Sequence, residues 1–214
     1  MITRSVEEKS CDTYKEARKE GSRMRIVCYG DSNTYGWDPR FFSGNRYEHP
    51  WPEMMAEMTG HAVKNCGEPG RMVPYREEQF DLFRLHVMRF EPELLVIMLG
   101  TNDLFYSLET TAGAIAGRMR NMIQYAVREQ LAQKILLLSC PKTTAPEEIY
   151  LPVLEELSDR YQEIAEEERI YFADPFHWDI PMAYDGVHFA EEGHRVFAEN
   201  ISEFIRKTFG TQKI

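Results

Sequence analysis

Five short runs of consecutive apolar residues, separated by longer segments with helical periodicity, constrain the fold of this chain more than any other feature. The runs are rich in valine, isoleucine and leucine, and they occupy residues 25–29, 62–66, 94–99, 134–139 and 169–173. They do not alternate polar with apolar positions, so each is expected to be a strand covered on both faces, as in parallel sheets flanked by crossover helices. The alternation predicts an α/β fold in three layers, α/β/α.

The segments between these runs are expected to be helices. They cover residues 52–58, 75–89, 111–130, 147–167 and 191–209. In the 111–130 segment, Ile115, Met119 and Met122 fall on one apolar stripe, so these methionines are expected to fill the core. A chain of 214 residues suits a single domain, assigned here to residues 24–214. Residues 1–23 are charged and have almost no apolar face, so a mobile N-terminal extension is expected there.

Charge and cysteine usage narrow the choice of partners. The formal net charge is −10, from 25 Lys and Arg against 35 Asp and Glu, which disfavours nucleic acid or an acidic membrane surface as a partner. No segment approaches the roughly 18 apolar residues that span a bilayer, and no secretory signal is visible. The four cysteines show no C-x-x-C spacing, so we expect reduced thiols and a cytoplasmic location.

Polar motifs follow several of the expected strands. The loops at the carboxyl ends of parallel strands converge on one edge of the sheet, where such folds bind ligands. The motifs are Gly30-Asp31-Ser32-Asn33-Thr34, Asn65-Cys66-Gly67-Glu68-Pro69-Gly70, Gly100-Thr101-Asn102-Asp103 and Asp185-Gly186-Val187-His188. Each alone is equally consistent with a helix cap or a tight turn. Together they supply complementary chemical groups at one edge, which favours an active site.

In this order, the four motifs resemble the signature of the SGNH hydrolases, also called GDSL esterases or lipases. The resemblance covers residues 25–204, and 32–36, 99–104 and 185–194 are most similar to the bacterial arylesterase and acetylesterase branch. It implies a flavodoxin-like, five-stranded parallel sheet with strand order 2-1-3-4-5. It also implies hydrolysis of carboxylic esters by a serine esterase, with a small-molecule ester as the partner and with no cofactor and no metal.

The resemblance assigns a catalytic triad. Ser32 would be the nucleophile, which needs a base because a free serine hydroxyl is too weak at neutral pH. His188 would take the serine proton and later return it to the leaving group. Asp185 would accept a hydrogen bond from the other ring nitrogen and so fix the imidazole tautomer. Asp31, beside the nucleophile, is assigned to shaping the turn.

The same resemblance implies an oxyanion hole. Its donors would be the Ser32 and Gly70 backbone N–H groups and the side-chain amide of Asn102. Gly70 is preferred to Gly67 because the family's donor follows the asparagine of this motif, here Asn65, by five residues. Asp103 is expected to cap or to hydrogen-bond nearby.

Two positions depart from the family pattern. Asn33 stands where the family name has leucine, and this bears on substrate preference. Pro69 lies within the second motif, where a rigid ring would reshape the pocket wall.

Aromatic residues crowd the motif loops, which favours an apolar pocket for the acyl or alcohol part of a substrate. The resemblance favours short acyl groups, such as acetyl on a sugar or an aryl alcohol. Residues expected to contact substrate are Asn33, Tyr35, Trp37, Phe105 and His177. His194 is expected to face solvent or a neighbour of the last helix. Because bacterial relatives assemble through such loops, the resemblance also implies a homo-oligomer.

Two other functions are consistent with parts of the sequence. A metal-dependent hydrolase or binding protein would use the acidic and histidine residues of 174–194, namely Asp174, His177, Asp179, Asp185, His188 and His194, although no H-E-x-x-H spacing occurs. A non-enzymatic flavodoxin-like binding domain would need a phosphate-cradling loop, of which 31–34 is a poor version. Within the ester class, an acetylated sugar, an aryl ester, a lipid and a thioester all stay open.

Overall fold

A parallel sheet forms the centre of the computed structural model, which describes residues 23–41, 45–106, 110–144 and 147–210. Its strands within these ranges are β1 (Arg25–Gly30), β2 (Ala62–Gly67), β3 (Leu94–Met98), β4 (Lys134–Leu138) and β5 (Tyr171–Ala173). They pair in the order β2-β1-β3-β4-β5, all parallel, which confirms the expected sheet and its order. The proposed extension of residues 1–23 lies, apart from Arg23, outside the described residues.

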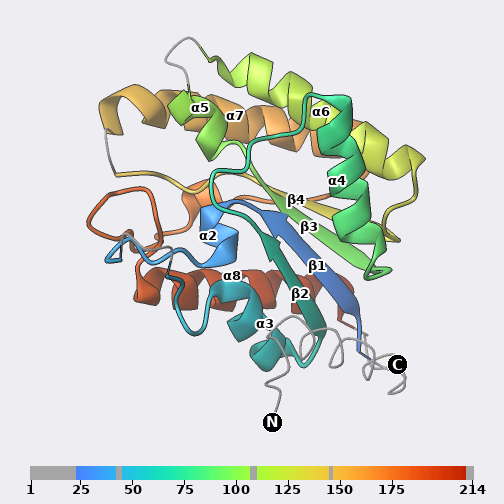
Figure 1. The fold of residues 1–214 in the computed structure, drawn as a ribbon, viewed down its shortest axis with the longest axis horizontal. Helices are drawn as coiled ribbons and strands as arrows, with labels where there is room; N and C mark the ends of the chain where they lie inside the picture. Colours follow the sequence, from blue (N-terminus) through green and yellow to red (C-terminus); the bar gives the residue numbers. More distant parts are fainter. Residues whose placement is uncertain (1–22, 42–44, 107–109, 145–146, 211–214) are drawn as a thin grey trace.

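Helices cover both faces of the sheet (Figure 1). On one face lie α3 (Trp51–Thr59) and α8 (Glu191–Phe209); on the other lie α4 (Glu77–Met88), α6 (Ala112–Arg128) and α7 (Glu147–Glu168). Short helical turns follow three strands: α2 (Ser32–Tyr35), α5 (Thr101–Tyr106) and the 3-10 turn η1 (Pro175–His177). The expected strands and longer helices agree with the observed ones to within two residues at each end. No helix in the described ranges is long and apolar enough to cross a membrane.

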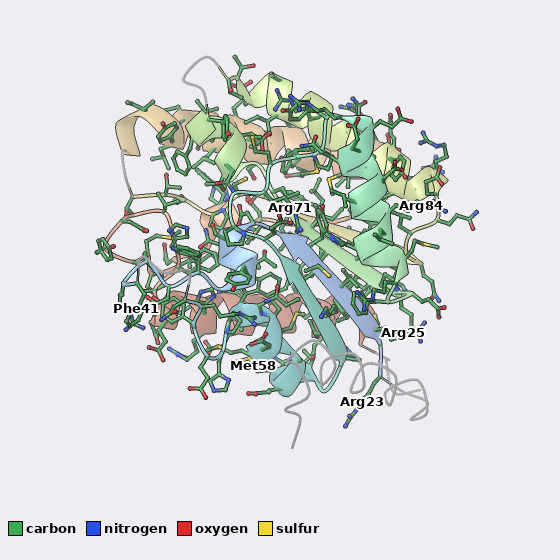
Figure 2. The ribbon with its side chains drawn as sticks, in the orientation of Figure 1. Arg23, Arg25, Phe41, Met58, Arg71 and Arg84 are labelled. Carbon is green, nitrogen blue, oxygen red and sulfur yellow. The ribbon has the colours of Figure 1, made fainter. Side chains whose placement is uncertain are left out.

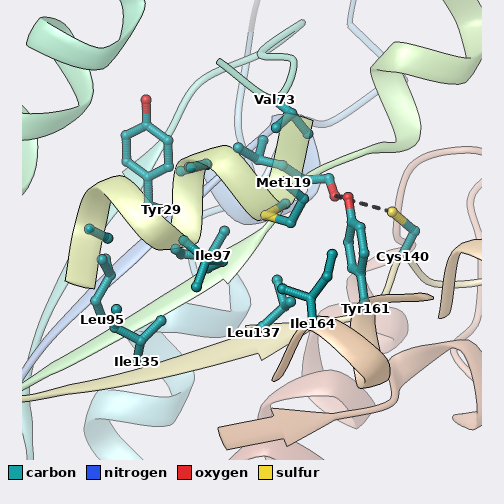
Figure 3. Packing of buried hydrophobic residues seen from close by; sticks show 14 of the residues in the cluster. Tyr29, Val73, Leu95, Ile97, Met119, Ile135, Leu137, Cys140, Tyr161 and Ile164 are labelled. Atoms are coloured by element: carbon teal, nitrogen blue, oxygen red, sulfur yellow. Dashed lines mark hydrogen bonds between the residues drawn. The ribbon is translucent and has the colours of Figure 1, made fainter. Parts of the chain in front are cut away.

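The purely apolar strands are explained by two separate cores. In β3, Leu95 and Ile97 pack under α4, α6 and α7, whereas Leu94, Val96 and Met98 pack under α3 and α8. Figure 3 shows the first of these cores, where Met119 from α6 and Tyr161 from α7 meet the strands. Both sides of each central strand are therefore buried, and each buried aliphatic side chain stabilises the fold by about 1.5–3 kcal/mol.

The register of the sheet brings the motif loops to a common level. Gly30 at the end of β1 lies opposite Gly67 of β2 and Met98 of β3. The loops that leave these three strands therefore start side by side at one edge of the sheet. This places the first three polar motifs next to one another.

Candidate active site

The turn that carries the expected nucleophile Ser32, residues 30–35, is called the nucleophile turn here; Gly30 and Asp31 give it its shape. A Cβ added at Gly30 would lie 2.0 Å from Thr34 Oγ1 and 2.9 Å from the Met98 carbonyl oxygen, so only glycine fits between β1 and β3 here. Asp31 caps α2, since its Oδ1 accepts a hydrogen bond of 3.0 Å from the Asn33 N–H. Ser32 is thereby held in the first turn of α2, at the carboxyl edge of the sheet.

Ser32, His188 and Asp185 form a continuous hydrogen-bonded chain. His188 Nε2 lies 3.0 Å from Ser32 Oγ, and His188 Nδ1 lies 2.6 Å from Asp185 Oδ2. The second oxygen of Asp185 accepts the backbone N–H groups of Val187 and His188, each at 3.0 Å. Partial burial alone would raise the pKa of Asp185, but these N–H groups and the imidazole outweigh it and lower that pKa. The carboxylate is thus kept ionised beside the imidazole.

Asn33 fixes the loop that carries Asp185 and His188, residues 185–189 and called the triad loop below, against the nucleophile turn. Its Nδ2 donates to the Val187 carbonyl at 3.0 Å, and its Oδ1 accepts from the Phe189 N–H at 2.8 Å. These two bonded residues flank His188, so the position of the imidazole relative to Ser32 depends on Asn33. The side chain is buried, and its amide, which was expected to contact substrate, is instead used on both sides within the protein.

Asp31 is an unusual carboxyl for a site of this kind because it is almost completely buried, at 3% exposure. Burial raises its pKa to about 6, although the Asn33 N–H and the charges of His188 and Arg71 pull in the opposite direction. Its Oδ1 is used in capping α2, as described above. Asp31 therefore shapes the turn, as expected, and it carries a proton near neutral pH more readily than an ordinary aspartate.

The loop that carries Gly70 is held between the nucleophile turn and α5. Gly70 has φ +77°, a conformation that favours glycine, and it is exposed. The Glu68 N–H donates to the Gly30 carbonyl at 3.1 Å on one side of the loop. On the other side, Asn102 Nδ2 donates to the Arg71 carbonyl at 3.0 Å. The three expected oxyanion donors thus belong to segments that are directly bonded to one another.

Asp103 bonds the loop that carries Gly70 to α5 and α6. Its fully buried carboxylate accepts the Val73 N–H at 3.0 Å and the Arg118 Nη1 at 3.1 Å. Burial raises the pKa of Asp103, and the two donors oppose that effect. The residue therefore joins α5, α6 and the loop after β2, which is the hydrogen-bonding role expected of it.

The aromatic residues expected at the pocket lie in different surroundings. The Trp37 ring is 6.3 Å from the His188 ring, so Trp37 lies beside the triad. The Tyr35 ring lies under the guanidinium of Arg46, at 5.2 Å. Phe105 packs edge-on against Tyr150 of α7 at 4.8 Å.

The segment rich in acidic and histidine residues divides into two pairs. His177 Nδ1 lies 2.5 Å from Asp174 Oδ2, and Asp174 also accepts the hydroxyls of Ser139 and Ser158. The imidazole of His177 is 63% exposed. Among the residues that the structure describes, no group of three or more His, Cys, Asp or Glu side chains is placed to hold a metal ion. The Asp174 pair and the triad are separate arrangements with the same spacing.

His194 lies in the core, so of the two expected environments, solvent or a neighbour of the last helix, it has the second. It is fully buried between the rings of Tyr47 and Phe189, and its Nδ1 accepts the Trp51 N–H at 3.4 Å. Burial lowers the pKa of His194 to about 3, so it stays neutral. Its contact with Phe189, the residue after His188, places it next to the loop that carries His188.

Two residues of the site were not found by sequence reasoning. Arg71 was passed over because an arginine in a loop is ordinarily solvated, yet its side chain is only 10% exposed. Figure 2 labels it near the carboxyl end of β1. The second is Tyr184, whose hydroxyl donates to the Pro39 carbonyl at 2.7 Å and so bonds the loop before His188 to the loop after α2.

Comparison with known proteins agrees with this geometry. The GDSL-like lipase/acylhydrolase family model matches residues 28–196, a span that contains all four motifs. Comparison with curated proteins gives no match. Among solved structures, the chain is similar to an aryl esterase from M. smegmatis, with a TM-score of 0.72 and 23% identity over 86% of this chain and 99% of that one.

A carbohydrate acetylesterase from Sinorhizobium meliloti is also similar, with a TM-score of 0.74 and 21% identity over 88% of this chain and 100% of that one. At such identities, these two likenesses establish a shared fold. The family match covers most of the sequence and includes the nucleophile turn, the Gly70 loop, the Asn102 turn and the triad loop. The chain therefore belongs to the GDSL-like lipase/acylhydrolase family.

Proposed function

We propose that this carboxylic ester hydrolase works through an acyl-enzyme on Ser32, with His188 as the general base and Asp185 as its orienting partner. One observation carries the proposal: the imidazole bridges the serine hydroxyl at 3.0 Å and the carboxylate at 2.6 Å. A serine in this arrangement can lose its proton as it attacks, which overcomes its weakness as a nucleophile.

The reaction proceeds in two halves. In acylation, Ser32 Oγ bonds to the ester carbonyl carbon while its proton passes to His188 Nε2. The tetrahedral intermediate then collapses, the bond to the alkoxy oxygen breaks, and Nε2 returns the proton to the leaving alcohol. In deacylation, water attacks the acyl carbon and gives a proton to Nε2, and Ser32 regains that proton as the acid leaves.

The negative oxygen of each intermediate is stabilised by the Ser32 and Gly70 N–H groups and the Asn102 amide. The hydrogen bonds between their segments support this assignment. Gly70 is suited to the role because a backbone donor without a Cβ admits close approach. The loss of one such donor costs about 3–4 kcal/mol of transition-state stabilisation.

Short acyl or aryl esters are the proposed substrate class. The similar structures are named an aryl esterase and a carbohydrate acetylesterase, which supports short acyl groups on varied alcohols. The Trp37 ring beside His188 offers an apolar surface to one side of the ester. In the active site, Tyr35 and Trp37 are the proposed substrate contacts.

Removal of the nucleophile tests the proposal. Ser32→Ala is expected to lower kcat for p-nitrophenyl acetate by about 10³-fold or more, with an unchanged circular dichroism spectrum. Ser202→Ala is the matched control, because Ser202 is also buried but lies on α8 in the core. Unchanged turnover in folded Ser32→Ala would exclude the mechanism.

A further inference from the structure

Arg71 is an arginine whose side chain is largely buried, which is uncommon for this residue type. Its side chain is 10% exposed and reaches the carboxyl end of β1, near which Figure 2 labels it. Its Nη1 donates to the Gly30 carbonyl at 2.8 Å and also to the Cys66 carbonyl. One guanidinium nitrogen thus bonds the ends of both β1 and β2.

Two further contacts hold the guanidinium in a single orientation. Nη2 donates to Glu68 Oε2 at 2.6 Å, and the guanidinium carbon lies 4.0 Å from the centroid of the Tyr29 ring. A planar guanidinium that is both forked and stacked is more rigidly placed than a lysine ammonium could be. The side chain is therefore built into the loop rather than hydrated.

Arg71 is also the point where the proposed oxyanion donors meet. Its side chain holds Gly30, which lies two residues before Ser32. Its own backbone follows Gly70 directly, and its carbonyl accepts the Asn102 amide at 3.0 Å. The segments of all three donors are thus bonded to this one residue.

We propose that Arg71 is a positioning residue that sets the spacing of the Ser32, Gly70 and Asn102 donors in the oxyanion hole. This inference rests on the proposed function and adds a residue to it. Arg71 touches no reacting atom. It acts by holding the nucleophile turn, the loop that carries Gly70 and the Asn102 amide at fixed positions relative to one another. Its charge also reaches the nucleophile turn, since it opposes the rise in the pKa of Asp31 that burial causes.

The kinetic consequence follows from when the donors act. Oxyanion contacts strengthen in the transition state, so a disturbance of their spacing lowers kcat and leaves KM nearly unchanged. Arg71→Met, which keeps the stem but removes the fork, is expected to lower kcat about tenfold or more. Arg71→Lys keeps the charge but cannot make all three bonds, so its kcat should lie between those of wild type and Arg71→Met.

Arg25→Met is the matched control. Arg25 lies at the opposite end of β1 (Figure 2), donates to the Glu91 carbonyl at 2.9 Å and pairs with Glu93 at 3.6 Å. Like Arg71, it binds a backbone carbonyl and a glutamate, but neither lies in the site, so the kcat of Arg25→Met is expected within about twofold of wild type. Each variant is checked for folding by circular dichroism. If Arg71→Met does not fold, Glu68→Ala removes one anchor of the guanidinium and should lower kcat in the same direction by a smaller factor.

A double-mutant cycle separates positioning from general loosening. Arg71→Met is combined with Asn102→Ala, and kcat for p-nitrophenyl acetate is measured for all four proteins. If Arg71 acts through the oxyanion site, the combined loss is smaller than the product of the single losses. Affinity for a boronic acid, which forms a tetrahedral adduct on the serine, should fall in parallel with kcat.

The outcomes are distinguishable. Wild-type kcat in folded Arg71→Met, or fully multiplicative losses in the cycle, overturns the positioning role while wild-type esterase activity stands. A wild-type protein that hydrolyses no ester overturns the proposed function itself. A change in the KM of Arg71→Met alone, with kcat unchanged, also contradicts the inference.

Discussion

Two aspartate–histidine pairs with the same three-residue spacing, Asp174 with His177 and Asp185 with His188, occur in the C-terminal part of the chain. Of these two pairs, the second bonds to a serine through its histidine. In the Asp185 pair, the far ring nitrogen of His188 lies 3.0 Å from Ser32 Oγ. In the Asp174 pair, Asp174 itself accepts the serine hydroxyls, and His177 is largely exposed. The pattern D-x-x-H alone therefore does not identify the proposed catalytic pair; the group bound to the histidine Nε2 distinguishes the two pairs.

This difference gives a paired prediction. Asp185→Asn is expected to lower kcat by about 10³–10⁴-fold, because the amide no longer selects the tautomer that leaves Nε2 free to accept a proton. Asp174→Asn, which removes the same charge from the other pair, should leave kcat within a few-fold of wild type. Steady-state kinetics on p-nitrophenyl acetate compare the two, and equal losses would contradict the assignment of Asp185.

Asp31 predicts a specific pH dependence of stability. Its pKa is raised by burial from 3.8 to about 6, so between these values the native protein keeps a proton that the unfolded chain has lost. Unfolding then releases a proton, and the free energy of unfolding falls as the pH rises through this window. A shift of about two units corresponds to about 3 kcal/mol.

Asp31→Asn cannot ionise but can still cap α2. The free energy of unfolding of Asp31→Asn relative to wild type should therefore rise by about 3 kcal/mol between pH 4 and pH 7, and then level off. Urea denaturation across this range measures the difference. If the difference stays constant with pH, Asp31 does not carry the raised pKa.

At the scale of elements, the site depends on how short turns are bonded to one another. α2 spans four residues and α5 spans six, too short for hydrophobic periodicity to reveal them in the sequence. The motifs, through the chemistry of their residue types and the family resemblance, predicted the candidate residues of the site. They could not predict that Asn33 bonds to Val187 or that Arg71 bonds to Gly30, because those partners lie 154 and 41 positions away in the chain.

Asn33→Ala tests the bond between α2 and the triad loop. It leaves the partly buried Val187 carbonyl and the buried Phe189 N–H unpaired, and a fully buried group left unpaired costs about 1–3 kcal/mol. It also frees His188, so kcat should fall along with the free energy of unfolding. Asn200→Ala is the control. Among the described residues, the side chain of Asn200 bonds to Val196 within α8, and its loss should cost less than about 1 kcal/mol.

At the scale of the whole molecule, the apolar runs predicted the five strands. The two-sided burial expected of them holds for β1, β3 and β4, whereas the edge strands β2 and β5 are partly exposed. Periodicity alone does not say which strands are neighbours, so the order β2-β1-β3-β4-β5 followed from the family resemblance. Register could not be read either, although it sets the common level of Gly30, Gly67 and Met98 on which the site is built. His194 shows the same limit, since its burial is decided by the packing of Tyr47, Trp51 and Phe189 from three separate segments.

The most direct test of the catalytic account is covalent labelling of the nucleophile. The protein is treated with diethyl p-nitrophenyl phosphate, and the modified residue is located by peptide mass spectrometry. We expect one diethylphosphoryl group for each protein molecule, attached to Ser32, and strongly slowed labelling in His188→Ala. An active enzyme that carries the group on another residue, or that stays unlabelled under inhibiting conditions, would contradict the assignment of Ser32.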